Sequence, residues 1–235
     1  MVTLKVFIGY DSKESVAWHT LAHSIYTLSS SPVSITPLKT SNLRGLYQRE
    51  NDARQSNAFS YTRFLVPYLC DYEGWALYLD CDMLVRFDLS ELFQPCKLNP
   101  SKAVSVVQHD YTSKVKTKYL GNKQYNYPRK NWSSAVLWNC SHVKNKQITP
   151  EVVNEQSPAF LHRFQWLEDE EIGQLDKKYN WLVGEYTEGM NEAKIIHWTL
   201  GGPYFHEHSE SSFSDEWFRS RDQMLHCDQL DPVKN

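Results

Sequence analysis

Cysteine is scarce in this sequence and never paired at short spacing, which excludes two classes of small scaffold. The 235 residues contain five cysteines, widely separated and without a CxxC motif. A disulfide framework or a structural zinc site is therefore not expected, and the pattern favours a reducing compartment. No signal peptide precedes the first expected strand, and no apolar run reaches about 18 residues. We expect a cytoplasmic protein without a transmembrane segment.

Other absences exclude common nucleotide-binding and nucleic-acid-binding classes. No G-x-G-x-x-G follows the first expected strand and no Walker-type loop occurs, so a dinucleotide oxidoreductase and a P-loop enzyme are not expected. The net charge is −3, and a chain of that balance is not typical of a nucleic-acid binder. No internal repeat is visible, which excludes a solenoid.

The hydrophobic pattern predicts an α/β protein with a mostly parallel central sheet flanked by helices. A buried strand at 5–9 is followed by a helix that begins near Ser12 and by a second strand at 33–36, which together form a β-α-β unit. Further strands are expected at 75–79, 83–85, 103–107, 134–138 and 194–197, and helices at 59–68, 150–164 and 215–225. We expect one domain over 1–235, with a core at 4–205 and a helical tail at 206–235, either complete or part of a longer protein.

Two aspartates stand directly after the most apolar of these strands. The segment WALYLDCDMLV places Asp80 and Asp82 one residue apart at the strand end. In open α/β sheets ligands bind at the carboxyl ends of strands, and two carboxylates buried there would repel each other unless a cation lies between them. Oxygen ligands suit Mg²⁺ or Mn²⁺. The alternative is a pair of exposed turn aspartates, but the buried strand before them favours the metal.

Six segments, in order, resemble the motifs of GT-A-fold glycosyltransferases related to glycosyltransferase family 8. They are Arg63-Phe64 with Pro67, then LYLDCDMLV, and then the segments at 88–92, 131–139, 167–172 and 196–203. The likeness covers roughly residues 4 to 205, and it implies the GT-A fold, a Rossmann-like nucleotide-sugar-binding architecture. It departs from the family at Gly202, where the family has a lysine.

The resemblance implies which residues hold the metal and the donor. Asp80, Asp82 and His197 match the family's ligands for Mn²⁺, with Mg²⁺ as the alternative. Arg63, Tyr10 and Asp11 match positions near the donor, where Tyr10 would stack on the base and Asp11 would accept from uracil. Asp11 also suits a helix cap. The remaining residues of the expected donor site are Ile8, Cys81, Gly201 and Gly202.

The resemblance also implies a reaction. Glu170 and Asp169 fall on the segment that meets the donor sugar in the family, so Glu170 is the expected nucleophile or base and Asp169 the expected contact to sugar hydroxyls. We expect a metal-dependent, retaining glycosyltransferase that moves a sugar from a UDP-type donor to a saccharide or other hydroxyl acceptor. Two alternatives stay open. One is a haloacid-dehalogenase-type phosphatase with Asp80 as nucleophile, and the other is an inactive nucleotide-sugar-binding module.

Overall fold

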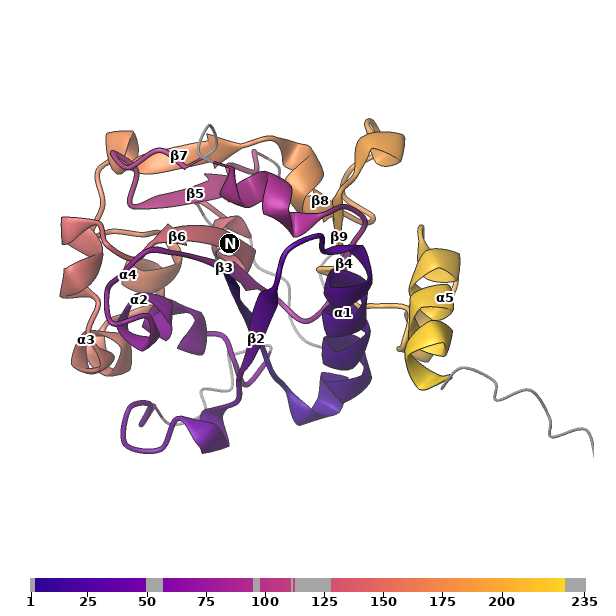
Figure 1. Cartoon of the computed structure of the whole chain (residues 1–235), viewed down its shortest axis with the longest axis horizontal. Coiled ribbons are helices and arrows are strands. Elements are labelled where there is room, and N and C mark those ends of the chain that lie inside the picture. Colours follow the sequence, from indigo (N-terminus) through magenta and orange to yellow (C-terminus); the bar gives the residue numbers. More distant parts are fainter. Residues whose placement is uncertain (1–2, 50–56, 95–97, 111, 113–127, 227–235) are drawn as a thin grey trace, which may run out of the picture.

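A six-stranded sheet forms the centre of the protein (Figure 1). The computed structural model describes residues 3–49, 57–94, 98–110, 112 and 128–226. The strand order is β2-β1-β3-β6-β5-β7, and only β6, among these strands, runs antiparallel to its neighbours. The bounds are β1 Leu4–Gly9, β2 Val33–Leu38, β3 Trp75–Leu79, β5 Val104–Val107, β6 Ala135–Asn139 and β7 Ile172–Leu175. This mostly parallel sheet confirms the predicted α/β class.

A smaller sheet stands beside the first and supplies part of the candidate site. Its order is β4-β9-β8, with β4 at Met83–Val85, β8 at Trp181–Leu182 and β9 at Ile195–His197. The antiparallel register of β4 and β9 pairs Met83 with His197. The chain enters β4 directly from the aspartate pair that ends β3, so the two sheets meet at those carboxylates.

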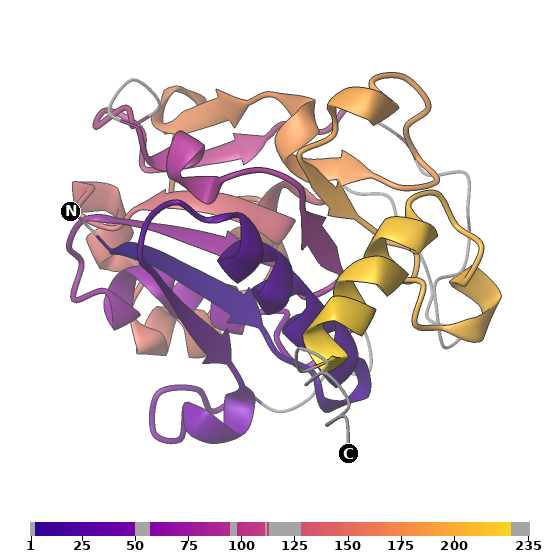
Figure 2. The same ribbon diagram turned by 45° about the vertical axis from the view of Figure 1, so that its right-hand side comes forward.

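The long helix α1, Ser15–Leu28, covers one face of the central sheet because its apolar residues lie on one side. Ala17, Leu21 and Ile25 are fully buried there. Asp11 accepts from the Lys13 amide and caps the short 3₁₀ turn that leads into the helix. The C-terminal helix α5, Ser214–Leu225, packs against α1 from outside (Figure 2). None of the described helices is both long and apolar enough to cross a membrane.

Short helices cover the other face, and here two predicted helices differ from the structure. The expected single helix at 150–164 is two helices, α3 at Pro150–Glu155 and α4 at Pro158–His162. Pro158 has no amide hydrogen and cannot continue α3, and Ser157 caps the new helix by accepting from the Phe160 amide. The helix expected at 59–68 is a 3₁₀ turn, Thr62–Leu65, followed by α2, Val66–Leu69.

Strand direction decides which side chains share an edge of the sheet. Strands β1, β3, β5 and β7 are parallel, so their carboxyl ends lie along one edge. Asp80 follows β3 at this edge, where its amide donates to the Ser134 carbonyl just before β6 (2.9 Å). The segments that precede β5 and β7 lie at the opposite edge, where the Ala103 amide donates to the Glu171 carbonyl (2.8 Å).

Candidate metal and donor site

Asp80, Asp82 and His197 converge at the junction of the two sheets. One ligand atom from each lies within 4.8 Å of the others. The pairing of β4 with β9 brings the histidine to the aspartates, and the Trp198 amide fixes this approach by donating to the Asp82 carbonyl (3.0 Å). The predicted convergence of these three residues, called the metal trio below, is confirmed.

The first aspartate of the trio is buried and held by two partners. Asp80 is 8% exposed, its carboxylate lies 2.9 Å from Arg63 Nη1, and it accepts from the Tyr78 hydroxyl at 2.6 Å. Burial raises the pKa of Asp80 above its ordinary value, the Arg63 guanidinium opposes this rise, and the neighbouring Asp82 adds to it. A cation between the carboxylates would favour their charged forms, which burial and mutual repulsion oppose.

The second aspartate leaves an acceptor that nothing in the described residues satisfies. Asp82 Oδ1 is buried and has no hydrogen-bond donor there, although buried carboxylate oxygens are costly to leave unpaired. It faces His197 Nε2 at 3.4 Å. Two carboxylates and an imidazole, with one oxygen lacking a donor, form a ligand set that fits Mn²⁺ or Mg²⁺.

Two residues that contact the trio were not predicted from the sequence. Tyr78 stands two residues before Asp80 along β3, so the alternation of side chains already placed both on one face and could have indicated the contact. Asn180 lies within 2.9 Å of His197 Nδ1 through its Oδ1, and it is fully buried. No local pattern marks Asn180, because it comes from a 3₁₀ turn distant in sequence from both aspartates.

The residues predicted for the nucleotide base lie at the end of β1, on the same edge as the trio. Both carboxylate oxygens of Asp11 accept from backbone amides, those of Lys13 and Ala58, each at 2.9 Å. Asp11 is therefore a helix cap that also fixes the start of the 57–60 segment. Tyr10 is half-buried beside Trp18, with ring centroids 6.2 Å apart, and the Ile8 carbonyl accepts from the Trp18 indole at 3.4 Å. Their contact with a base stays a prediction.

The other expected donor contacts follow strands that reach the same edge. Cys81 is fully buried between the two aspartates, and burial raises the pKa of its thiol well above the ordinary range. Gly201 and Gly202 come after β9 and are buried. Gly201 has a φ of +141°, a backbone conformation open to glycine and strained for other residues. Their contact with phosphate stays a prediction.

The structure does not bring Asp169 and Glu170 to the trio. They form the short turn that precedes β7, at the edge of the sheet opposite Asp80. Both are exposed, Asp169 forms an ion pair with Arg129, and the Glu170 carbonyl accepts from Lys102 Nζ at 2.5 Å. The sequence pattern did not predict β7, so the direction of the chain after this acidic segment was unknown.

A curated relative shares high identity with this chain over nearly its whole length. Protein CDI of Arabidopsis thaliana is 47% identical over 225 residues, which cover 93% of this chain and 86% of that protein. The chain belongs to the Protein CDI family. No protein-family model matches it.

Solved structures similar to this member of the Protein CDI family are glycosyltransferases. WbbM, a bifunctional glycosyltransferase, matches with a TM-score of 0.67 and 15% identity over 93% of this chain and 49% of that one. GlyE of Streptococcus pneumoniae matches with a TM-score of 0.60 and 15% identity over 94% and 63% of the two chains. The galactosyltransferase LgtC matches with a TM-score of 0.55 and 11% identity over 96% and 98%. The chain thus spans about half of WbbM and less than two thirds of GlyE. The shared fold of these structures confirms the predicted GT-A fold.

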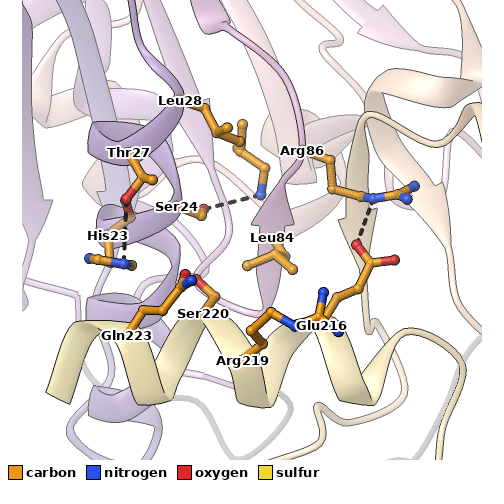
Figure 3. A pocket seen from close by; sticks show the side chains of 11 residues that line it. His23, Ser24, Thr27, Leu28, Leu84, Arg86, Glu216, Arg219, Ser220 and Gln223 are labelled. Carbon is orange, nitrogen blue, oxygen red and sulfur yellow. Dashed lines mark hydrogen bonds and ion pairs between the residues drawn. The ribbon is translucent and has the colours of Figure 1, made fainter. Parts of the chain in front are cut away.

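A pocket of about 270 Å³ in this CDI-family chain lies between α1, β4 and α5 (Figure 3). An ion pair between Arg86 and Glu216, 2.8 Å long, stands at one end, and the Val85 amide donates to Ser24 Oγ at 3.2 Å within it. None of the residues predicted for the metal or the donor lines this pocket. The candidate site is therefore the sheet edge at the trio.

Proposed function

We propose that this chain is a metal-dependent glycosyltransferase that transfers a sugar from a UDP-type donor to a hydroxyl group of a saccharide or related acceptor, with retention at the anomeric carbon. The observation that carries the proposal is the metal trio at the carboxyl edge of a GT-A sheet. One similar structure, that of LgtC, is described as a complex with donor and acceptor sugar analogues, which supports a donor site in this fold.

Mn²⁺ or Mg²⁺ would be held by Asp80, Asp82 and His197. When bound, the cation supplies positive charge that stabilises the diphosphate leaving group. The protein's own contribution is to hold the ligands in place before binding. Arg63 and Tyr78 fix the orientation of the Asp80 carboxylate, so it does not have to reorient when the donor binds.

The same edge supplies the proposed nucleotide contacts. Tyr10 and Asp11 would meet the base, and Gly201, which carries no side chain, would allow close approach of a phosphate. Gly202 would contact the donor through its backbone, because the Tyr204 ring fills the space where its side chain would lie. Arg63 lies 2.9 Å from the Asp80 carboxylate and donates to the Ser133 carbonyl at 2.8 Å. We therefore propose that it acts on the donor through the orientation of Asp80.

Mn²⁺-dependent binding and turnover test the proposal. A panel of nucleotide sugars is screened for thermal stabilisation with and without Mn²⁺, and stabilising donors are then assayed for release of UDP. We expect stabilisation only with metal, its loss in EDTA, and its loss in Asp82→Asn. The matched control is Asp71→Asn, an exposed aspartate whose positive φ of 53° asparagine tolerates.

Each other outcome assigns a different function. Metal-dependent binding of the donor without release or transfer would favour a nucleotide-sugar-binding module. Turnover of a phosphomonoester, with none of nucleotide sugars, would favour the phosphatase alternative. Normal donor turnover in EDTA would refute the metal assignment.

The catalytic roles of Glu170 and Asp169 stay proposals from the sequence. The resemblance supports them, whereas their place at the opposite edge of the sheet gives them no geometric support. Glu170→Gln tests the assignment directly. A rate far below wild type at unchanged Mn²⁺ affinity would support it, and an unchanged rate would exclude it.

A further inference from the structure

A chain of three hydrogen bonds, two of them buried, leads from the backbone to the histidine of the metal trio. Ser134 Oγ lies 2.7 Å from the Asn131 carbonyl oxygen, Asn180 Nδ2 lies 2.9 Å from Ser134 Oγ, and Asn180 Oδ1 lies 2.9 Å from His197 Nδ1. Ser134, Asn180 and His197 are 3%, 0% and 2% exposed. Water therefore does not compete for these groups, and the direction of each bond follows from the protein alone.

The direction of the chain fixes which nitrogen of the imidazole carries the proton. A carbonyl oxygen can only accept, so the single hydroxyl hydrogen of Ser134 points to the Asn131 carbonyl. Ser134 Oγ can then only accept from Asn180, which must present its NH₂ group on that side. The amide oxygen of Asn180 consequently faces His197, and Nδ1 must be the protonated nitrogen. This reasoning does not depend on how the amide or the ring is labelled.

We propose that Asn180 is a positioning residue that holds His197 as the Nδ1–H tautomer and so directs the Nε2 lone pair to the metal. The proposal rests on the proposed function in so far as it concerns the cation. Nε2 lies 3.4 Å from Asp82 Oδ1, the buried oxygen that has no donor among the described residues. If Nε2 carried the proton, it could donate a hydrogen bond to that oxygen. Because the Asn180 contact holds the proton on Nδ1, His197 Nε2 and Asp82 Oδ1 are two acceptors that face the same point, where a cation fits.

A purely structural role for Asn180 is the competing explanation, since it also joins the turn before β8 to Ser134. Asn145 offers a matched comparison. It is equally buried, at 0% exposure, and its Nδ2 donates to the Ala103 and Asn139 carbonyls at 2.8 Å each. Its partners lie at the opposite edge of the sheet, so its loss should affect stability without affecting the metal.

The tautomer can be measured on the metal-free wild-type protein, without any substitution. A ¹⁵N–¹H correlation spectrum of the imidazoles, recorded at a pH where they are neutral, distinguishes Nδ1–H from Nε2–H. We expect His197 as Nδ1–H. Ser134→Ala removes the hydroxyl that orients the amide, so Asn180 can turn over and the His197 signal should show Nε2–H. Nε2–H in the wild type would overturn the proposal, as would an unchanged Nδ1–H signal in Asn180→Leu, which leaves Nδ1 without this acceptor.

Metal affinity supplies the second readout, measured by calorimetric titration with MnCl₂ alone. Asn180→Leu removes the acceptor and should weaken Mn²⁺ binding by about 10–100-fold. Asn180→Asp keeps an acceptor toward Nδ1 and should restore the affinity to within a few-fold of wild type. Asn145→Asp and Asn145→Leu should leave Mn²⁺ affinity unchanged.

The two measurements separate this inference from the proposed function. Equal Mn²⁺ affinity in wild type, Asn180→Leu and Asn180→Asp would overturn the positioning role while the metal site stands. A wild-type protein that holds Nδ1–H but binds no Mn²⁺ would refute the proposed function, and with it the role of Asn180 toward a cation.

Discussion

Acid should destabilise this protein through His162, a half-buried imidazole next to the arginine of the candidate site. Its Nδ1 lies 2.8 Å from Ser133 Oγ, and its ring packs on Phe64 with centroids 5.3 Å apart. Burial lowers the pKa of His162 to about 3, and the charges of Arg63 and Arg49 contribute in the same direction. Above that pH the His162 imidazole is therefore neutral in the folded state.

The size of the effect follows from the difference in proton binding between the two states. An unfolded histidine has a pKa of about 6.5, so its contribution to stability is fully present above that pH and falls as the pH drops, down to the folded pKa. Between pH 7 and pH 5 the unfolded imidazole becomes almost fully protonated and the folded one does not. The free energy of unfolding should drop by about 2 kcal/mol from this group alone. A folded pKa one unit higher would leave this figure nearly unchanged.

Urea unfolding at pH 7 and pH 5 measures the drop in wild type, His162→Gln and His206→Gln. Glutamine at 162 keeps a partner for the Ser133 hydroxyl and cannot titrate, so its drop should be smaller than that of wild type by about 2 kcal/mol. The exposed His206 is the matched control, and its variant should show the wild-type drop. The same drop in His162→Gln as in wild type would refute the assignment of acid sensitivity to this imidazole.

Three further predictions concern the same edge of the sheet. Arg63→Met leaves the buried Asp80 carboxylate without its cationic partner and should lower the unfolding free energy by about 3–5 kcal/mol in urea. Arg221→Met breaks a partly exposed ion pair and should cost below about 1 kcal/mol. Part of the Arg63→Met loss should return when MnCl₂ is added, and no return would argue against a cation at the trio. Gly9→Ala would place a methyl group 2.2 Å from the Phe59 ring, so the unfolding free energy should fall by about 1–3 kcal/mol. The melting temperature should fall with it, and a wild-type melting curve would contradict this prediction.

The sequence predicted the central strands from local patterns, and the metal trio from a local motif joined to a family resemblance. Apolar runs such as WALYL read as buried strands, and β3 and β6 occupy the expected segments within one residue. The trio followed from a motif at a strand end together with a resemblance that spans the chain. The fold class and the convergence of Asp80, Asp82 and His197 could therefore be stated without coordinates.

What could not be predicted depends on tertiary pairing. The short strands β7 and β8 contain Gly, Gln and Trp in runs too brief to show a period, and they are strands only because β5 and β9 pair with them. Without β7, the direction of the chain after Glu170 stayed open, so its distance from the trio was unknown. Asn180 was missed for the same reason, since only the folded chain brings it to His197.

The order of the sheets along the chain has a consequence for synthesis and proteolysis. Both aspartates and their fixing partners Arg63 and Tyr78 are present once the chain has reached Asp82, whereas the imidazole arrives only with β9. A nascent or clipped chain that stops before β9 has the two carboxylates at the sheet edge but lacks the histidine that we propose as the third metal ligand. If the proposed metal role holds, tight metal binding should therefore require that translation has passed β9 and that β9 has paired with β4.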